Sequence, residues 1–453
     1  MPDHQDRAAD PAAPARTPRL LWASVYCLLD TSSGAAMAVR EMLRQLARHG
    51  YDIAILGAAV FDHARGAGHL DLNTPRGRVA TVRDGSLIHR LYVTERPERA
   101  RMTAREETAW FALYRHCLDR HRPDLVCYYG GQALDYLIAA EARARGLPVA
   151  FYLANANYGQ LRWCRDVDLV LTNSQAMADL YRQRLGIRPV PLGLFVDPRR
   201  VVAPQHVPER ILFVNPLPEK GAGLVARLAR LLQQRRPEFR FEVVESRGAW
   251  EQALRAFPAA PGEPEGTLDN VTVTPTTADM RPVYGRARLL LAPSLCWEAA
   301  GRVVAESLLN GIPAIVTARG GMPEMLGEGG LVCNLPAAYH APPYRRVPSA
   351  AELEPLLRQI ARLHDDPAYY AQLAARARRA GERRHGLAAS TGRLLAALQP
   401  LLARRAGDRD PGALLRQRHR HGLDDRPPSA DGPAPLADTS APSADAPASP
   451  DRR

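Results

Sequence analysis

The chain has 453 residues, which is too long for a single hydrophobic core and therefore predicts two domains. Its hydrophobic content of 46% is typical of a soluble globular protein, and no apolar run approaches the ~18 residues that a membrane span requires. The net charge of +12 would allow contact with nucleic acid or an anionic membrane. Because the arginines are spread along the chain and form no compact basic motif, we expect no nucleic-acid partner.

The cysteines and the single lysine give further information on the class of protein. The six cysteines show neither C-x-x-C nor zinc-type spacing, which predicts buried thiols in a reducing cytoplasm. Only Lys220 among the 60 basic residues is a lysine. An arginine side chain ends in a wide planar fork, whereas a lysine side chain carries a compact charge on a flexible stem. We therefore expect Lys220 to mark a site where a guanidinium group does not fit. The alternative is that this lysine has been retained by chance.

The chain begins with a polar, Pro- and Ala-rich segment, residues 1–17, which we predict to be disordered. The apolar stretch Arg19–Leu29 predicts the first strand of a Rossmann-like domain. A signal-peptide core is the alternative, but the stretch is short and leads directly into the polar loop Asp30–Gly34. A helix over Ala35–His49 and a strand over Asp52–Leu56 complete a βαβ start. The chain lacks G-x-G-x-x-G here, which counts against NAD binding.

Strand and helix patterns alternate through the rest of the first half. Asp84-Gly85 predicts a hairpin turn within Val79–Val93. The strand that ends at Leu153 is followed by the polar segment Ala154–Tyr158. The predicted elements are helices over Thr103–Arg120 and Gln132–Arg145, strands over Pro123–Tyr129, Pro148–Leu153 and Asp168–Thr172, and a helix from Ser174 to Leu185.

The second half repeats the order of strand, short loop and helix. A strand over Arg210–Val214 leads through a loop ending in Lys220 to a helix over Leu224–Gln234, and a strand over Phe241–Glu245 ends in Ser246-Arg247-Gly248. Beyond about residue 406 the sequence is rich in Pro, Ala, Asp and Ser, which predicts disorder. The other predicted elements are strands over Val271–Val273, Ala287–Ala292, Ala314–Thr317 and Leu331–Asn334, and helices over Ala350–Leu363, Pro367–Arg384 and Ala388–Ala406.

The stretch Ser294–Gly330 carries the clearest chemical pattern. Glu298 and Glu306 are separated by seven residues and lie in the loop and the helix, Gly301–Leu309, that follow a buried strand. In open α/β sheets such loops bind ligands, and the N–H groups of a helix start suit hydroxyls and phosphates. A nucleotide sugar has a sugar at one end, a ribose at the other and a diphosphate between them. One carboxylate that binds the sugar and another that binds the ribose would therefore form a nucleotide-sugar site. An amphipathic helix with two solvated glutamates is the alternative.

Several motifs occur together in this stretch. Glu298-x7-Glu306 encloses Gly301-Arg302-Val303-Val304 and is followed by Gly311-Ile312-Pro313 and Gly320-Gly321-x-Pro323-Glu324. The combination resembles glycosyltransferase family 4, and the resemblance extends over residues 18–400. It implies an α/β fold of the GT-B type, in which two Rossmann-like domains face each other across a cleft and a C-terminal helix crosses back to the first domain. It also implies a retaining transferase.

The resemblance assigns roles to four residues. Glu298 would contact the donor sugar and support its developing positive charge, and Glu306 would hold the nucleotide ribose. Lys220 occupies the family's diphosphate-binding position, and Gly34 lies where a family glycine approaches the donor phosphates. Lys220 and Glu298 are therefore the predicted catalytic residues.

The resemblance also supplies the other candidates. An arginine commonly accompanies the lysine of the diphosphate loop, whereas here Asn215 is the nearest polar residue. Many members have a histidine over the reacting sugar where this chain offers alanine and asparagine, so the family's catalytic group from the first domain has no direct counterpart. The further donor-binding candidates are Arg247, Ala300, Gly301 and Arg302, and the acceptor-side candidates are Asn155, Asn157 and Tyr158.

The expected domain organisation follows the GT-B pattern, with Pro191–Asp197 resembling the family's linker. We predict a disordered N-terminus (1–17), an N-terminal Rossmann-like acceptor-side domain (18–200), a C-terminal Rossmann-like nucleotide-sugar domain (201–385), a crossing helix (386–406) and a disordered tail (407–453).

These expectations describe a retaining glycosyltransferase of the hexosyltransferase type. It would move a sugar from a nucleoside-diphosphate sugar to an acceptor hydroxyl in the biosynthesis of a glycan, polysaccharide or glycoconjugate. The nucleotide sugar is a substrate, we expect no cofactor, and because neither loop contains D-x-D we expect no metal. The acceptor would be a saccharide or lipid-linked, and the protein cytoplasmic, with peripheral membrane contact left open. Two alternatives stay open: a GT-B sugar-nucleotide epimerase and a non-catalytic nucleotide-sugar-binding scaffold.

Overall fold

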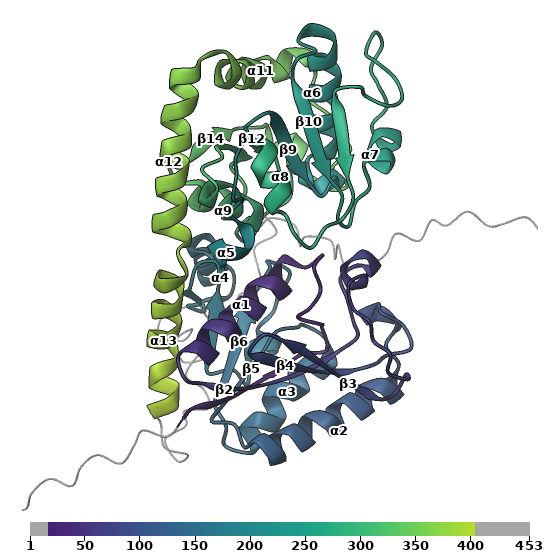
Figure 1. Cartoon of the computed structure of the whole chain (residues 1–453). Helices are drawn as coiled ribbons and strands as arrows, with labels where there is room; N and C mark the ends of the chain where they lie inside the picture. Colours follow the sequence, from purple (N-terminus) through teal and green to yellow (C-terminus); the bar gives the residue numbers. More distant parts are fainter. Residues whose placement is uncertain (1–16, 404–453) are drawn as a thin grey trace, which may run out of the picture.

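The structure, a computed structural model, describes residues 17–403 (Figure 1). It contains two α/β units, each built on its own sheet, and the predicted fold class is confirmed. The predicted disordered segments 1–17 and 407–453 lie, except for Thr17, outside the described residues. The exact domain boundaries stay a prediction.

The first sheet has eight strands in the order β3-β4-β2-β1-β5-β6-β7-β8. Neighbouring strands are parallel except β3 and β4, which form the predicted hairpin. The strands are β1 (Arg19–Ala23), β2 (Asp52–Ala58), β3 (Val79–Asp84), β4 (Leu87–Tyr92), β5 (Leu125–Tyr128), β6 (Val149–Leu153), β7 (Leu169–Thr172) and β8 (Val190–Pro191).

The side chains of β1 alternate between two apolar layers because successive residues of a strand point to opposite faces. Leu20 and Trp22 join the layer that contains α1 (Gly34–Arg48), and Leu21 and Ala23 join the layer on the other face. The apolar stretch at the start of the chain is thus a central strand, although it ends at Ala23 rather than Leu29. The opposite layer is formed by α2 (Ala104–His121), α3 (Ala133–Ala144) and α4 (Gln175–Leu185).

The second sheet has six parallel strands in the order β11-β10-β9-β12-β13-β14. The strands are β9 (Arg210–Val214), β10 (Arg240–Val244), β11 (Val271–Thr274), β12 (Ala287–Ala292), β13 (Ala314–Thr317) and β14 (Gly330–Cys333). One apolar layer contains α6 (Ala222–Arg235), α7 (Trp250–Ala256) and α11 (Ala350–Asp365). The other contains α5 (Pro198–Val201), α8 (Arg281–Arg286), α9 (Arg302–Leu309), α10 (Met322–Leu326) and α12 (Pro367–His385).

The last two helices, α12 and α13 (Leu387–Ala403), run along one side of both domains (Figure 1). Three buried leucines of α13, Leu394, Leu398 and Leu401, pack in the first domain's core beside α1. The Ser390 hydroxyl donates to the carbonyl of Leu194 in the linker at 3.0 Å. The predicted crossing of the C-terminal helix onto the first domain is therefore confirmed. Within residues 17–403, no helix is long and apolar enough to cross a membrane.

Candidate active site

Loops that follow the strands of the two sheets meet between the domains. Trp297 and Ala299, in the loop after β12, pack against the apolar core of the first domain. The hydroxyl of Ser174, after β7, donates to the carbonyl of Ala299 at 2.5 Å. Because open α/β sheets bind ligands outside the carboxyl ends of their strands, this interface is the position expected for the site.

Two loops of the second domain form one unit at this interface. The carbonyl of Glu219, in the loop after β9, accepts hydrogen bonds from the N–H groups of Leu295 (2.8 Å) and Cys296 (3.2 Å). Gly221 lies in the left-handed region (φ 86°), and a Cβ there would be 2.4 Å from the carbonyl oxygen of Pro293. Only glycine permits this close contact, so the loop carrying Lys220 is fixed against the loop carrying Glu298.

Lys220 and Glu298 form an ion pair in which Nζ and Oε1 lie 2.5 Å apart. The hydroxyl of Ser294 donates to the same carboxylate oxygen at 2.7 Å. The side chains of Lys220 and Glu298 are 21% and 17% exposed, so the pair is partly screened from water while still accessible. The two predicted catalytic residues are thus in direct contact. Ser294 was not predicted, because in a loop its spacing of four residues from Glu298 does not indicate a contact.

The charges of this pair support each other. Burial alone would raise the pKa of Glu298, but the ammonium of Lys220 outweighs it and holds this pKa below its usual range. Burial alone would lower the pKa of Lys220, but the carboxylate of Glu298 raises it above its usual value. Both groups are therefore charged at neutral pH. Arg247 acts on both, lowering the pKa of each, so its guanidinium lies nearby.

The predicted glycine pair after β13 supports the Glu298 loop from behind. Gly320 has φ 58°, and a Cβ there would lie 2.0 Å from the carbonyl oxygen of Glu298. The N–H of Gly321 donates to that same carbonyl at 2.8 Å. A Cβ on Gly321 would lie 2.6 Å from the carbonyl oxygen of Ala299. The pair of glycines therefore allows backbone-to-backbone contact that fixes Glu298.

Glu306 lies in α9 and is only 6% exposed. Its carboxylate accepts a hydrogen bond from the hydroxyl of Tyr284 at 2.8 Å and forms an ion pair with Arg302 at 2.6 Å. Arg302 also donates to the carbonyl of Phe195 in the linker at 3.1 Å. Both predicted donor-binding residues already have partners within the protein, and their donor contacts stay predictions. Sequence reasoning gave no role to Tyr284, because nothing in the sequence pairs it with Glu306.

Ala300 and Gly301 form the backbone that leads into α9. Ala300 is buried, and Gly301 has φ 101° with a would-be Cβ only 2.4 Å from Sδ of Met322. Neither α9 nor α6, the helix after Lys220, has a side chain capping its N-terminus. Helix N-termini carry unpaired N–H groups and a partial positive charge, so both helices can receive a negatively charged group.

Gly34 is the first residue of α1. It is exposed, and a Cβ there would meet nothing within 4 Å. The Ser33 hydroxyl accepts from the N–H of Ala36 at 3.3 Å and so caps this helix. The open space at Gly34 is compatible with the predicted approach of a phosphate, which stays a prediction.

Asn215 and Arg247 follow neighbouring strands, β9 and β10. Asn215 has φ 64°, and its Oδ1 accepts from the N–H of Gly248 at 3.0 Å, so it ties the two loops together. The Nε of Arg247 is buried and has no hydrogen-bond partner within residues 17–403. Arg247 therefore has bonding capacity to spare close to the Lys220–Glu298 pair.

Arg65 of the first domain extends to the same loop and was not predicted. Its Nη1 lies 3.4 Å from a carboxylate oxygen of Glu245 and 3.3 and 3.4 Å from the carbonyls of Ser246 and Gly248. Arg65 lies in a short 3-10 turn, Ala64–Ala67, and nothing in its sequence neighbourhood signals a partner 180 residues away.

The acceptor-side candidates lie after β6 in the first domain. Asn155 and Asn157 are exposed, and Oδ1 of Asn155 accepts from the N–H of Asn157 at 3.1 Å. Tyr158 is partly buried and packs against Phe151 and Trp163 with ring centroids 5.5 and 5.0 Å away. This aromatic cluster belongs to the core against which the Glu298 loop packs. The candidates therefore lie on the side of the first domain that faces the second.

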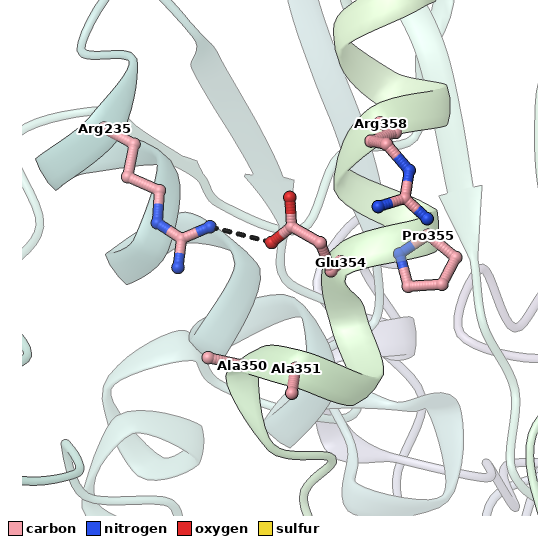
Figure 2. Close-up of a pocket in the computed structure, with 6 residues that line it drawn as sticks. All are labelled: Arg235, Ala350, Ala351, Glu354, Pro355 and Arg358. Atoms are coloured by element: carbon pink, nitrogen blue, oxygen red, sulfur yellow. Dashed lines mark hydrogen bonds and ion pairs between the residues drawn. The ribbon is translucent and has the colours of Figure 1, made fainter.

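A separate surface pocket is lined by residues of α6 and α11 (Figure 2). These two helices lie at the outer end of the second domain (Figure 1). An ion pair of 2.9 Å joins Arg235 of α6 to Glu354 of α11 across the pocket. Its lining shares no residue with the site, so we assign it no part in the chemistry; it consists of Arg235, Ala350, Ala351, Glu354, Pro355 and Arg358. In the described part of the chain, no three His, Cys, Asp or Glu side chains are grouped so that they could hold a metal ion.

Two models of glycosyltransferase families match the chain. The family model described as Glycosyltransferase Family 4 matches residues 32–200, and the model described as Glycosyl transferases group 1 matches residues 208–341. Together the two models cover more than half of the chain. No curated protein sequence matches it.

Several solved structures with the same fold align with most of the chain. Sucrose-phosphate synthase from Thermosynechococcus elongatus has a TM-score of 0.61 at 16% identity, covering 86% of this chain and 100% of its own. HepE of Anabaena, in complex with UDP-glucose, has a TM-score of 0.58 at 16% identity, covering 84% and 99%. The UDP-forming trehalose-phosphate synthase from Burkholderia vietnamiensis has a TM-score of 0.57 at 14% identity, covering 86% and 98%.

The fold is that of the GT-B glycosyltransferases. With both of its domains matched, the chain belongs to the glycosyltransferase family that the two models describe, and it is an enzyme of class EC 2.4.

Proposed function

We propose that the enzyme transfers a sugar from a nucleoside-diphosphate sugar to an acceptor hydroxyl with retention of configuration at the anomeric carbon. The ion pair of Lys220 and Glu298, on loops that lead into the uncapped helices α6 and α9, carries the proposal. A cation, a carboxylate and free N–H groups are what a diphosphate-linked sugar requires. HepE in complex with UDP-glucose and the UDP-forming synthase support a nucleotide-sugar donor.

Binding of the donor would break the ion pair between Lys220 and Glu298. Lys220 would turn to the diphosphate, together with Arg247, Gly34 and the N-termini of the two helices, and Glu298 would face the sugar. A hydrogen bond to a charged group contributes about 1.5–3 kcal/mol, so bonds to the donor can replace the bond that is broken. Glu306 would hold the ribose, and Asn215, Ala300, Gly301 and Arg302 would complete the wall around the donor.

The reaction would proceed by front-face transfer. The bond between the anomeric carbon and the diphosphate oxygen breaks, and its electron pair leaves with the diphosphate. The acceptor oxygen bonds to the anomeric carbon on the same face, and its proton passes to a donor phosphate oxygen. Glu298 stabilises the positive charge on the sugar, and Lys220 stabilises the negative charge on the leaving group.

The proposed acceptor is a saccharide or a lipid-linked saccharide, bound against Asn155, Asn157 and Tyr158. A lipid-linked acceptor would bring the enzyme into peripheral contact with a membrane. Because Lys220 and Arg247 supply positive charge for the diphosphate, we expect transfer to need no metal ion.

A thermal-shift screen against UDP, GDP and ADP sugars would find the donor. Turnover with candidate acceptors, with and without EDTA, and the anomeric configuration of the product by NMR would then test the proposal. An inverted product would contradict retention. An isomerised donor sugar without acceptor would indicate an epimerase. Donor binding with neither transfer nor slow hydrolysis would indicate a non-catalytic scaffold.

A further inference from the structure

The N-terminus of α4, in the first domain, is capped by a side chain of the second domain. The two carboxylate oxygens of Glu324 accept hydrogen bonds from the N–H groups of Gln175 and Ala176, both at 2.9 Å. Glu324 lies in α10 and belongs to the Gly320-Gly321-x-Pro323-Glu324 motif. A carboxylate at a helix N-terminus is stabilised by both the hydrogen bonds and the helix dipole.

Ser174 makes a second connection at the same helix end. Its buried hydroxyl accepts from the N–H of Met177 at 3.1 Å and donates to the carbonyl of Ala299 at 2.5 Å. Because the hydroxyl accepts one bond and donates the other, its orientation is fixed. The end of α4 therefore holds both α10 and the residue directly after Glu298.

These contacts converge on the backbone of Glu298. From the second domain, the N–H of Gly321 holds the carbonyl of Glu298 at 2.8 Å. From the first domain, Ser174 holds the neighbouring carbonyl of Ala299. Glu324 follows Gly321 by three residues and fixes that support to α4. If the domains separated, the Glu298 loop would lose its first-domain contacts while keeping its contact with Gly321.

We propose that Ser174 and Glu324 are positioning residues that make the placement of the Glu298 carboxylate depend on contact between the two domains. The enzyme would then bind donor through the second domain and become competent for transfer only when α4 is docked. This rests on the proposed function, in which Glu298 acts on the donor sugar. Simple adhesion between the domains is the competing explanation, and it would not affect the chemical step selectively.

The test compares Glu324→Gln, Glu324→Ala and Ser174→Ala with Gln175→Ala. The Gln175 side chain bonds only Asp179 on its own helix among the described residues, at 2.9 Å, so Gln175→Ala is a matched control. With the donor found by the screen, we expect kcat to fall about tenfold in Glu324→Ala and Ser174→Ala, and less in Glu324→Gln, which keeps one acceptor oxygen. We expect the donor KM and the affinity for the free nucleoside diphosphate to change less than twofold, and Gln175→Ala to behave as the wild type.

Hydrogen exchange at the amides of Gln175 and Ala176 gives a readout that needs no turnover. Both should exchange faster in Glu324→Ala than in the wild type, while the amides in the middle of α4 stay protected. Unchanged exchange would overturn the capping role, even if no donor supports turnover. Wild-type kcat in Glu324→Ala, or a loss confined to KM, would overturn the positioning role while leaving the transferase proposal intact.

Discussion

Lys220 is the only lysine among 60 basic residues, and its ammonium lies 2.5 Å from Glu298 in a loop fixed by Gly221. A compact ammonium fits beside one carboxylate oxygen, whereas a guanidinium presents a broad plane. We predict that Lys220→Ala and Glu306→Ala each reduce donor turnover at least tenfold, equivalent to about 1.4 kcal/mol. Lys220→Arg should recover only part of the loss.

Steady-state kinetics with purified variants would check these losses. Arg235→Ala, which removes a partner of the outer ion pair with Glu354, is the control and should keep wild-type activity. Full activity in Lys220→Ala would show that the diphosphate is held by other groups, with Arg247 as the first candidate.

The pH dependence of the Glu298 pair gives a second prediction. The folded-state pKa of Glu298 is depressed, so its contribution to stability is complete above its ordinary value of 4.5 and is lost as pH falls through the folded value. Lys220→Met leaves the carboxyl with burial but without the ammonium, which raises its pKa. We expect the acid limb of the residual activity to move to higher pH.

The same variant should show the effect in its stability. The difference in unfolding free energy between the wild type and Lys220→Met should be largest near neutral pH and shrink in acid, where Glu298 is protonated in both. Urea titrations at several pH values would measure it. A difference that does not vary with pH would mean that the ion pair contributes little.

At the level of single residues, sequence identified the acids and the lysine but not all of their neighbours. Glu298 and Glu306 stood out because of their seven-residue spacing around Gly301-Arg302 after a predicted strand. Lys220 stood out because it is the only lysine. Arg65 did not stand out, because its contact with Glu245 joins two domains and the two residues are remote in sequence. The family roles of these residues stay predictions, even where the structure brings them together.

Among the elements, the turn after β13 shows how backbone geometry supports a side chain. Gly320 has φ 58° and leaves no room for a Cβ against the backbone of Glu298. We predict that Gly320→Ala lowers turnover at least tenfold and destabilises the second domain by about 1–3 kcal/mol, because the strained backbone must shift. Activity assays and thermal unfolding would check both effects.

Gly392→Ala is the matched glycine control. Gly392 is exposed within α13, and a Cβ there would meet nothing within 4 Å. Alanine should stabilise this helix by about 0.5–1 kcal/mol and leave turnover unchanged. If Gly320→Ala also left turnover unchanged and did not destabilise the protein, the backbone contact between Gly320 and Glu298 would not contribute to activity.

Most elements could be predicted because their apolar periodicity is strong. The strands that flank the site, β9 and β12, and the helix α9 are almost as expected, within a residue at each end. The first strand was predicted too long, because apolar residues continue after Ala23 although the regular ladder stops there. Helix α7 was missed, because its seven residues, Trp250–Ala256, are too few to show a helical period.

At the scale of the whole molecule, α13 completes a domain from which it is remote in sequence. Leu398 is fully buried against the first domain's core. We predict that Leu398→Ala destabilises the first domain by about 2–5 kcal/mol, the usual cost of a large-to-small change in a core. Hydrogen exchange followed separately in β1 and β9 would show faster exchange in β1.

Leu373→Ala is the counterpart in α12, because Leu373 is buried in the second domain's core. It should increase exchange in β9 and spare β1. If Leu398→Ala acted equally on both strands, the two domains would unfold as one cooperative unit.

The main chain passes between the domains twice, once through the linker at Leu194 and again at Gly386 between α12 and α13. The bond from Ser390 to Leu194 keeps these passages side by side, so we expect them to act as one hinge. A hinge at one edge of the molecule permits rotation of the two domains but resists sliding of one domain past the other. The displacement of a residue during this rotation grows with its distance from the hinge. The loop that Arg65 holds leads into α7, on the side away from α12 and α13 (Figure 1). If the two domains rotate apart about this hinge, we expect the Arg65 contact to separate early and by a large distance, which would open a path for the proposed donor.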